Sequence, residues 1–346
     1  CEESLKNDDG SYFALVAPSH RPQRAQSYTL KLSVYSPEGW KHKQAPLLVL
    51  PRPDQINIKT ILNRPELVKE HFVFLDTNGR GGMARIPVSW GMLTSRYDGL
   101  LAANLSSEFP EDRWIMFARC RAWLVFQGYS QELNTDCLEA FGVDAESGGN
   151  WRYHIPSGQG EHVLLTLGLK MTDEENAVQL TFYRHRAEGS GNRLDDQKPV
   201  QLILRQDIEN RSFHETTKAY MGPEYHWHHK ITQSKKGFYF SPDTDHHLQI
   251  QLSDGNFIWE PEWHYMVHRA IDAERGLDPD SDLFSPGYFS VDLKGNQQAT
   301  LFASISKTPK IKTLTSPSIN PQPNGPFESD TEIDHRPVGL LNRSLN

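Results

Sequence analysis

The sequence predicts an all-β protein, a large antiparallel β-sandwich with short helical decorations, on the basis of two patterns. Apolar and polar residues alternate with a period of two, as in segment 28–35, where one face carries Tyr28, Leu30, Leu32 and Val34. Turn signals such as 187–192 (AEGSGN) and 252–256 (LSDGN) separate the alternating segments at short intervals, and no long helical pattern alternates with them as a βαβ fold requires. Each strand is therefore expected to bury one face and expose the other.

The same alternation predicts further strands along the chain. They cover residues 162–170, 177–185, 199–206, 247–254 and 288–295. Helical patterns are short: one spans 63–70, with a proline in its first turn, and one spans 262–278, where Gly276 is suited to follow a helix end. Helices are therefore expected only as decorations of the sandwich.

Composition along the chain suggests three regions. We expect an irregular N-terminal tail over 1–27, the β-sandwich domain over 28–305, and a linker over 306–346. The linker assignment rests on its many Pro, Ser, Thr and Asn residues and its few large apolar side chains. A further domain is expected to follow this linker.

Composition and charge exclude several classes of function. The chain has 346 residues, 37% of them hydrophobic, and a net charge of −8, which disfavours nucleic acid as a partner. No apolar run approaches the roughly 20 residues that span a bilayer, and the N-terminus lacks a signal-peptide core. Cys1, Cys120 and Cys137 show no CxxC spacing, so we expect reduced thiols. Together these features predict a cytoplasmic protein without membrane contact. We expect neither a metal nor a cofactor.

A glycine-rich stretch at 77–82 (TNGRGG) follows the apolar segment 71–75. It matches neither GxxxxGK[ST] nor GxGxxG, and no helix start follows it, so a phosphate-binding loop is disfavoured. Asn-Gly supports positive φ, which is typical of a turn between strands. From the residues alone, an internal turn and the rim of a binding site both remain open.

Three ordered patches resemble one family. TNGRGG with 95–103 (SRYDGLLAA) is similar to TNGxGG…RYHGLL in the N-terminal domain of bacterial and archaeal glycogen debranching enzymes, the amylo-α-1,6-glucosidases, although Asp98 stands where that family usually has His. Segment 199–217 resembles the family's LRPxxxxRDFH stretch, with Gln206 for Pro and Ser212 for Asp. Segment 271–293 is similar to ExxRGLDxxEDLFSPG. Together the resemblance covers residues 78–301.

The resemblance implies a β-supersandwich of the galactose-mutarotase-like and glucoamylase N-terminal-domain-like kind, which precedes an (α/α)6 barrel. In such enzymes the barrel holds the acid and base that hydrolyse the glycosidic bond. The chain is therefore expected to be the non-catalytic N-terminal domain of a glycogen debranching enzyme, with no catalytic residue of its own. Its expected partners are the (α/α)6 catalytic domain of the same polypeptide and a branched α-glucan.

The resemblance also implies which residues line the substrate rim or the interface with the barrel. They are Asn78, Gly79, Arg80, Gly81, Gly82, Arg96, Tyr97, Gly99, Arg275, Gly276, Asp282, Pro286 and Gly287. Small glycine surfaces let another backbone or a sugar ring approach closely. The competing interpretation is a purely internal turn.

Two other functions are weighed against this one. A free-standing glucan-binding module would stack glucose rings on aromatic side chains such as Trp90, Trp227, Trp259 and Trp263, although large aromatics mostly lie in cores. A self-contained carbohydrate-active enzyme on a mutarotase-like sandwich would use a histidine with carboxylates drawn from Glu260, Glu262, Glu274 and Asp282. Alternation of His226 and His228 on a strand, with His229 beside them, would allow a metal site, but solvated histidines are the favoured interpretation.

Overall fold

The computed structural model describes two separate units of the chain. The described residues are 5–6, 10, 12–13, 26–37, 39–49, 60–309 apart from 107, 110, 145–146 and 188–191, and Phe327. Contacts between Cα atoms divide the chain into Cys1–Ile58 and Lys59–Asn346.

The first unit contains two antiparallel strand pairs. β1 (Leu5–Lys6) pairs with β2 (Tyr12–Phe13), and β3 (Gln26–Ser36) pairs with β4 (Gly39–Val49) along its full length. The strand predicted at 28–35 is thus present. It lies in the first unit, Cys1–Ile58. The apolar face of β3 is exposed within this unit, with Leu32 at 51%.

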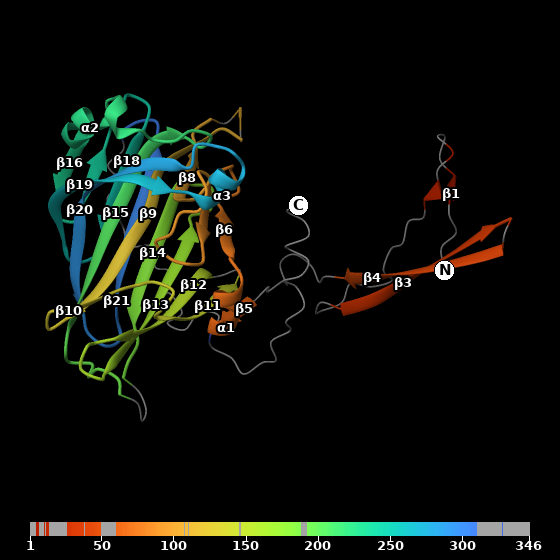
Figure 1. Cartoon of the computed structure of the whole chain (residues 1–346), viewed down its shortest axis with the longest axis horizontal. Coiled ribbons are helices and arrows are strands. Elements are labelled where there is room, and N and C mark those ends of the chain that lie inside the picture. The colour runs from red at the N-terminus through yellow and green to blue at the C-terminus, as the bar shows by residue number, and fades with distance from the viewer. Residues whose placement is uncertain are drawn as a thin grey trace. The chain divides into compact units, whose positions relative to one another are not determined.

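The second unit contains two large antiparallel sheets (Figure 1). The first sheet follows the order β19 (Asn256–His268), β20 (Asp280–Leu293), β15 (Val200–Ser212), β9 (Arg113–Phe126), β8 (Gly99–Asn104), β7 (Met83–Pro87) and β6 (Val73–Thr77), and β10 (Tyr129–Glu132) also pairs with β9. The second follows the order β16 (Ile231–Ser234), β17 (Gly237–Phe240), β18 (His247–Leu252), β21 (Gln297–Ser306), β14 (Ala177–Arg184), β13 (His162–Met171), β12 (Gly148–Pro156), β11 (Leu138–Asp144) and β5 (Thr60–Asn63).

One hydrophobic core fills the space between the two sheets. It combines side chains of the first sheet, such as Leu204 and Phe289, with side chains of the second, such as Leu167 and Phe182, all 0% exposed. Alternate residues of each strand supply this core, as the period of two predicts. The predicted all-β supersandwich is therefore confirmed.

Helices are short, as predicted, but one of them is placed differently. The described helical segments are α1 (Arg64–Lys69), η2 (Ala219–Met221), α2 (Pro223–His226), η3 (Trp227–Lys230) and α3 (Ala270–Glu274). The helical pattern at 63–70 forms α1, whose first turn is closed by a hydrogen bond of 2.8 Å from Asn63 N to the Glu66 carboxylate. The pattern at 262–278 forms a helix only at α3, and it was wrong for residues 262–268, which pair with β20 as part of strand β19.

No helix among the described residues is both long enough and apolar enough to cross a membrane.

His185, just after β14, makes the stability of the fold dependent on pH. Burial, reinforced by the charges of Arg152 and Arg193, lowers its pKa from 6.5 to about 4, and Nε2 lies 2.7 Å from Thr166 Oγ1. Between these pH values the unfolded chain binds a proton that the folded chain does not, so stability is full above pH 6.5 and falls as the pH drops toward 4. We expect a loss of about 1–2 kcal/mol, because the half-buried ring is partly screened.

Urea denaturation at pH 7 and at pH 4.5 tests this expectation in the native chain and in the His185→Gln variant. The variant should lose less stability on acidification than the native chain. An equal loss in both proteins would assign the pH dependence to other groups.

Candidate functional site

The glycine-rich turn at 77–82 is organised around the side chain of Asn78. This residue is only 2% exposed, and its Oδ1 accepts hydrogen bonds of 2.9 Å from both Arg80 N and Gly82 N. Gly79 and Gly81 have φ values of 73° and 91°, in the left-handed region that glycine tolerates best. The sequence thus needs glycine for the path of the backbone and asparagine to hold it.

The same asparagine ties the turn to the second sheet. Its Nδ2 donates to Glu175 O at 2.9 Å and to Asn176 Oδ1 at 3.2 Å, both in the turn 172–176 between β13 and β14. The backbone adds a hydrogen bond of 2.8 Å from Glu174 N to Asn78 O. The Asn78 amide therefore serves the protein interior, whereas Arg80 is exposed.

Asp98, which stands where the resembling family usually has His, is a buried structural residue. It is 0% exposed, and its Oδ2 accepts hydrogen bonds from Thr94 N at 2.6 Å and Ser95 N at 2.9 Å. Its Oδ1 pairs with the guanidinium of Arg85 on β7. This carboxylate fixes the loop that precedes β8 and neutralises Arg85.

The loop around Arg96 meets two segments that are distant in sequence. Asp272 of α3 accepts hydrogen bonds from Ser95 Oγ at 3.2 Å and from Arg96 N at 2.7 Å. The Arg96 guanidinium donates to His214 O at 2.8 Å and to Asp278 O at 3.1 Å. The three segments 95–99, 211–217 and 270–282 therefore form one assembly, which we call the motif corner.

A buried ion pair lies beneath the motif corner. Glu209 Oε1 accepts hydrogen bonds from Arg211 Nε at 2.8 Å, Ser281 Oγ at 2.9 Å and Thr217 Oγ1 at 3.1 Å, and Arg269 Nη2 lies 3.3 Å away. Burial alone would raise the pKa of Glu209, but the two arginines outweigh it and lower the pKa to about 2. Glu209 and Arg269 are both 0% exposed, so this pair is part of the framework.

Asp282 joins the motif corner to the neighbouring loops. Its Oδ2 accepts a hydrogen bond of 2.8 Å from Ala219 N, and its Oδ1 accepts one of 2.8 Å from Met266 N. Met266 has a φ of 52°, which is unusual for a residue with a side chain. The carboxylate is 6% exposed and stabilises this local conformation.

The glycine-rich turn and the motif corner are connected through Arg113. Its Nε donates to Gly81 O at 2.6 Å, and its guanidinium lies 5.5 Å from the ring centroid of Phe213. Phe213 in turn packs against Tyr97, with ring centroids 4.6 Å apart. The structure therefore brings together the predicted residues of the turn and those around Arg96 and Tyr97.

The other predicted residues divide between this surface and the sheet. Arg275 and Gly276 are exposed after α3, and Gly276 has a φ of 72°. Gly99 is buried in β8, where an added Cβ would lie 3.3 Å from Ile115 Cγ2. Pro286 and Gly287 are buried within β20, and Gly287 faces the backbone of β19 too closely for a side chain. These last three positions serve the packing of the first sheet.

The sequence model described as "Glycogen debranching enzyme N terminal" matches residues 73–300, which is more than half of the chain and includes the turn and the motif corner. The chain belongs to this family. No curated protein sequence matches it. Among solved structures, a bacterial glucoamylase complexed with acarbose is similar, with a TM-score of 0.31 and 8% identity; the match covers 72% of this chain and 36% of the glucoamylase.

Sequence reasoning missed one surface feature of this family member. Five large side chains are exposed beside the motif corner, and we call them the tyrosine–methionine patch: Tyr220 (72%), Met221 (72%), Tyr225 (68%), Tyr265 (51%) and Met266 (70%). Tyr265 Oη donates to the Glu224 carboxylate at 2.6 Å, which links β19 to α2. The only sequence signal was the density of aromatic residues in 220–227 and 263–266.

The structure answers several alternative site predictions. Trp90 and Trp227 are core residues, exposed by 4% and 6%. Residues 226–229 are helical, so the expected strand alternation of His226 and His228 is wrong, and the described residues contain no cluster suited to a metal ion. Of the four carboxylates considered for an acid and base pair, Glu262 forms ion pairs with two arginines. It lies 2.8 Å from Arg121 Nη2 and 2.9 Å from Arg205 Nη1.

Proposed function

We propose that the chain acts as the non-catalytic N-terminal domain of a glycogen debranching enzyme. In this proposal it supports the active site of an (α/α)6 barrel in the same polypeptide, and the barrel hydrolyses α-1,6 branches of a glycogen-like glucan. The observation that carries the proposal is the tyrosine–methionine patch beside the family's motif corner. A cytoplasmic location belongs to the proposal, since Cys120 and Cys137 are free thiols.

The composition of the patch favours a protein partner. Aromatic residues and methionine are enriched in the centres of protein interfaces, and a surface of this kind marks an interaction site. Two contacts connect the patch to the motif corner. Asp282 Oδ1 accepts a hydrogen bond from Met266 N, and Lys218 Nζ, close in sequence to Tyr220, lies 2.8 Å from Asp278 Oδ2. A partner seated on the patch would therefore also contact Arg275 and Leu277, which are exposed nearby.

The carboxylates of the motif corner support a framework role. Asp98, Asp272 and Asp282 each accept hydrogen bonds from backbone N–H groups of the surrounding loops, and Glu209 is held by two arginines. Carboxylates used in this way hold loops in position. They are poorly placed for the paired acid and base work of glycoside hydrolysis. The catalytic groups are accordingly assigned to the barrel.

A complementation experiment tests the proposal. The chain alone is expected to release no glucose from an α-1,6-branched dextrin, and the separately produced catalytic domain should gain activity when the chain is added. Replacing Tyr225 and Met266 with serine should weaken the association of the two parts at least 10-fold, because both side chains lose buried apolar area.

The matched control is Val68→Ser on α1, which is 69% exposed and distant in sequence from the patch. It should leave association and activity unchanged. Turnover by the chain alone that persists through further purification, or equal effects of the patch and control variants, would contradict the proposal.

A further inference from the structure

The hairpin of β3 and β4 is too small a sheet to be stable by itself. Its strands pair in antiparallel register from Gln26 and Val49 to Ser36 and Gly39, and among the described residues they form a sheet of two strands (Figure 1). A two-stranded hairpin is at best marginally stable in water, whereas three or more strands with a hydrophobic face are stable. The hairpin therefore needs a further partner.

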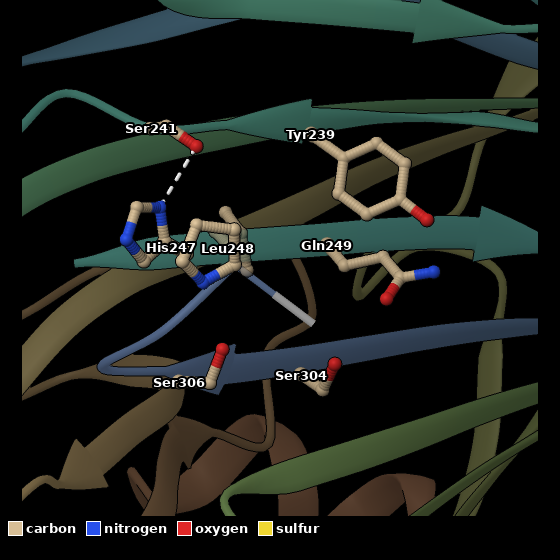
Figure 2. A pocket seen from close by; sticks show the side chains of 8 residues that line it. Tyr239, Ser241, His247, Leu248, Gln249, Ser304 and Ser306 are labelled. Atoms are coloured by element: carbon tan, nitrogen blue, oxygen red, sulfur yellow. Dashed lines mark hydrogen bonds between the residues drawn. The ribbon is translucent and has the colours of Figure 1, made fainter. Parts of the chain in front are cut away.

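One face of β3 is apolar and exposed. Its side chains, between 42% and 51% exposed, are Tyr28, Leu30, Leu32 and Val34. Outward positions on the second sheet of the sandwich are different, because Figure 2 shows hydroxyl and amide groups there, such as Ser304 on β21 and Gln249 on β18. The apolar face of β3 therefore marks an interaction surface.

The opposite face of the hairpin is occupied by its own contacts. Ser33 Oγ lies 2.9 Å from His42 Nδ1, and the rings of Tyr35 and Trp40 pack edge to face with centroids 5.3 Å apart. Side chains alternate between the faces of a strand, so Lys31 also belongs to this opposite face. The apolar surface of β3 is thus separate from its polar and charged side chains.

The two outer edges of the hairpin differ in their ability to accept another strand. Pro46 of β4 stands opposite Thr29, and because proline has no N–H, this pair is not hydrogen-bonded within the hairpin. Such pairs alternate along an antiparallel ladder, so Thr29, Lys31, Ser33 and Tyr35 turn their backbone N–H and C=O groups toward the outer edge of β3. The outer edge of β4 lacks a donor at Pro46, which is a common protection of edge strands, whereas β3 contains no proline. The edge of β3 is therefore the one suited to strand pairing.

The sequence of β3 is complementary to itself in antiparallel orientation. A register centred on Leu32 places Leu32 of the two copies opposite each other and Leu30 opposite Val34, so apolar side chains meet across the seam. Lys31 then stands opposite Ser33, and two lysines do not meet. The lysines of the apolar face lie on β4 and thus outside the seam. Charge therefore does not oppose the pairing.

We propose that β3 pairs with β3 of a second copy of this chain. The two hairpins then form one antiparallel sheet of four strands in the order β4, β3, β3 and β4, which reaches the size that an independent sheet requires. The pairing is isologous, and the protected edges of β4 end it at two copies. This dimer is formed by the first unit, so it does not depend on the tyrosine–methionine patch or on the proposed function.

Sedimentation equilibrium of the full chain tests the dimer. We expect association at micromolar concentrations, and Lys31→Pro should weaken it about 10-fold or more, because it removes an N–H from the outer edge of β3 without breaking a hydrogen bond to β4. Gln44→Pro is the matched control, since Gln44 stands directly opposite Lys31 and turns its N–H to the outer edge of β4. It should leave association unchanged. NMR spectra check that each variant is folded.

A cross-linking experiment tests the register without proline. In the proposed seam the two Leu32 positions form a non-hydrogen-bonded pair, in which side chains lie closest, so Leu32→Cys should join two chains by a disulfide on oxidation with diamide. Lys43→Cys is the control, because Lys43 stands opposite Leu32 on β4 and lies outside the seam. It should give no more cross-linked dimer than the native chain on a non-reducing gel.

Several results would overturn the proposal. They are a native chain that remains monomeric at about 100 μM, a dimer that folded Lys31→Pro leaves intact, equal weakening by Lys31→Pro and Gln44→Pro, and equal cross-linking of Leu32→Cys and Lys43→Cys. A dimer that is weakened by serine at Tyr225 and Met266 but not by Lys31→Pro would assign association to the tyrosine–methionine patch and would also overturn it. None of these results changes the complementation experiment, so failure of the dimer and failure of the proposed function are distinguishable.

Discussion

Replacing Glu209 with alanine is expected to lower the free energy of unfolding by about 3–5 kcal/mol. The carboxylate is fully buried, and its removal leaves the charges of Arg211 and Arg269 beneath the motif corner without their counterion. Arg269 is itself fully buried, and its Nε and Nη1 already lack hydrogen-bond partners among the described residues. Urea denaturation at neutral pH measures the loss.

Glu260→Ala is the matched control for this experiment. Its side chain is 62% exposed although it lies 2.6 Å from Arg205 Nη2, so its loss should cost less than about 1 kcal/mol. The Glu209 effect also has a defined pH dependence. Because its folded pKa is lowered from 4.5 to about 2, its contribution is full above pH 4.5 and is lost as the pH falls toward 2. Equal stability of the two variants at neutral pH would contradict the assignment.

The sequence predicted the sandwich because its strands bury one face. Strand β13 shows this directly: Val163, Leu165, Leu167 and Leu169 are all at most 3% exposed, and they are the residues that the alternation selects. The sequence pattern predicted the wrong element where a short run of residues fits both a helical and a strand period. The run from Glu262 to His268 fits a helical period but pairs with β20.

The site was predicted less completely, because its decisive contacts join residues that are distant in sequence. The family resemblance selected segments that contact one another in the structure, but it did not separate exposed positions from buried ones. Asn78 bonds to Asn176, 98 residues away, and Ser95 bonds to Asp272, 177 residues away. Such contacts leave no local pattern. The tyrosine–methionine patch was not predicted, because aromatic residues in a sequence are as consistent with a buried core as with an exposed surface.

Replacing Asn78 with alanine should produce the second large loss, about 2–4 kcal/mol. Two backbone N–H groups, of Arg80 and Gly82, lose their acceptor, and the donor bonds to the turn at 172–176 are removed as well. The loss of hydrogen bonds should therefore destabilise both the glycine-rich turn and the second sheet. Hydrogen exchange is expected to accelerate at Gly82 and at Glu174, whose amide binds Asn78 O.

Two glycine variants decide whether Asn78 and the glycines act as one unit. An alanine Cβ at Gly82 would lie 2.5 Å from Asn78 Nδ2, so Gly82→Ala should break the same hydrogen bonds from the other side. Gly79→Ala meets no atom within 4 Å and should cost only about 1–2 kcal/mol for its φ of 73°. Because Gly82 and Asn78 share these bonds, the double variant should lose clearly less than the sum of the two single losses. Full additivity would show that the glycine and the asparagine stabilise the turn independently, and the turn would then not be a single hydrogen-bonded unit linking the two sheets.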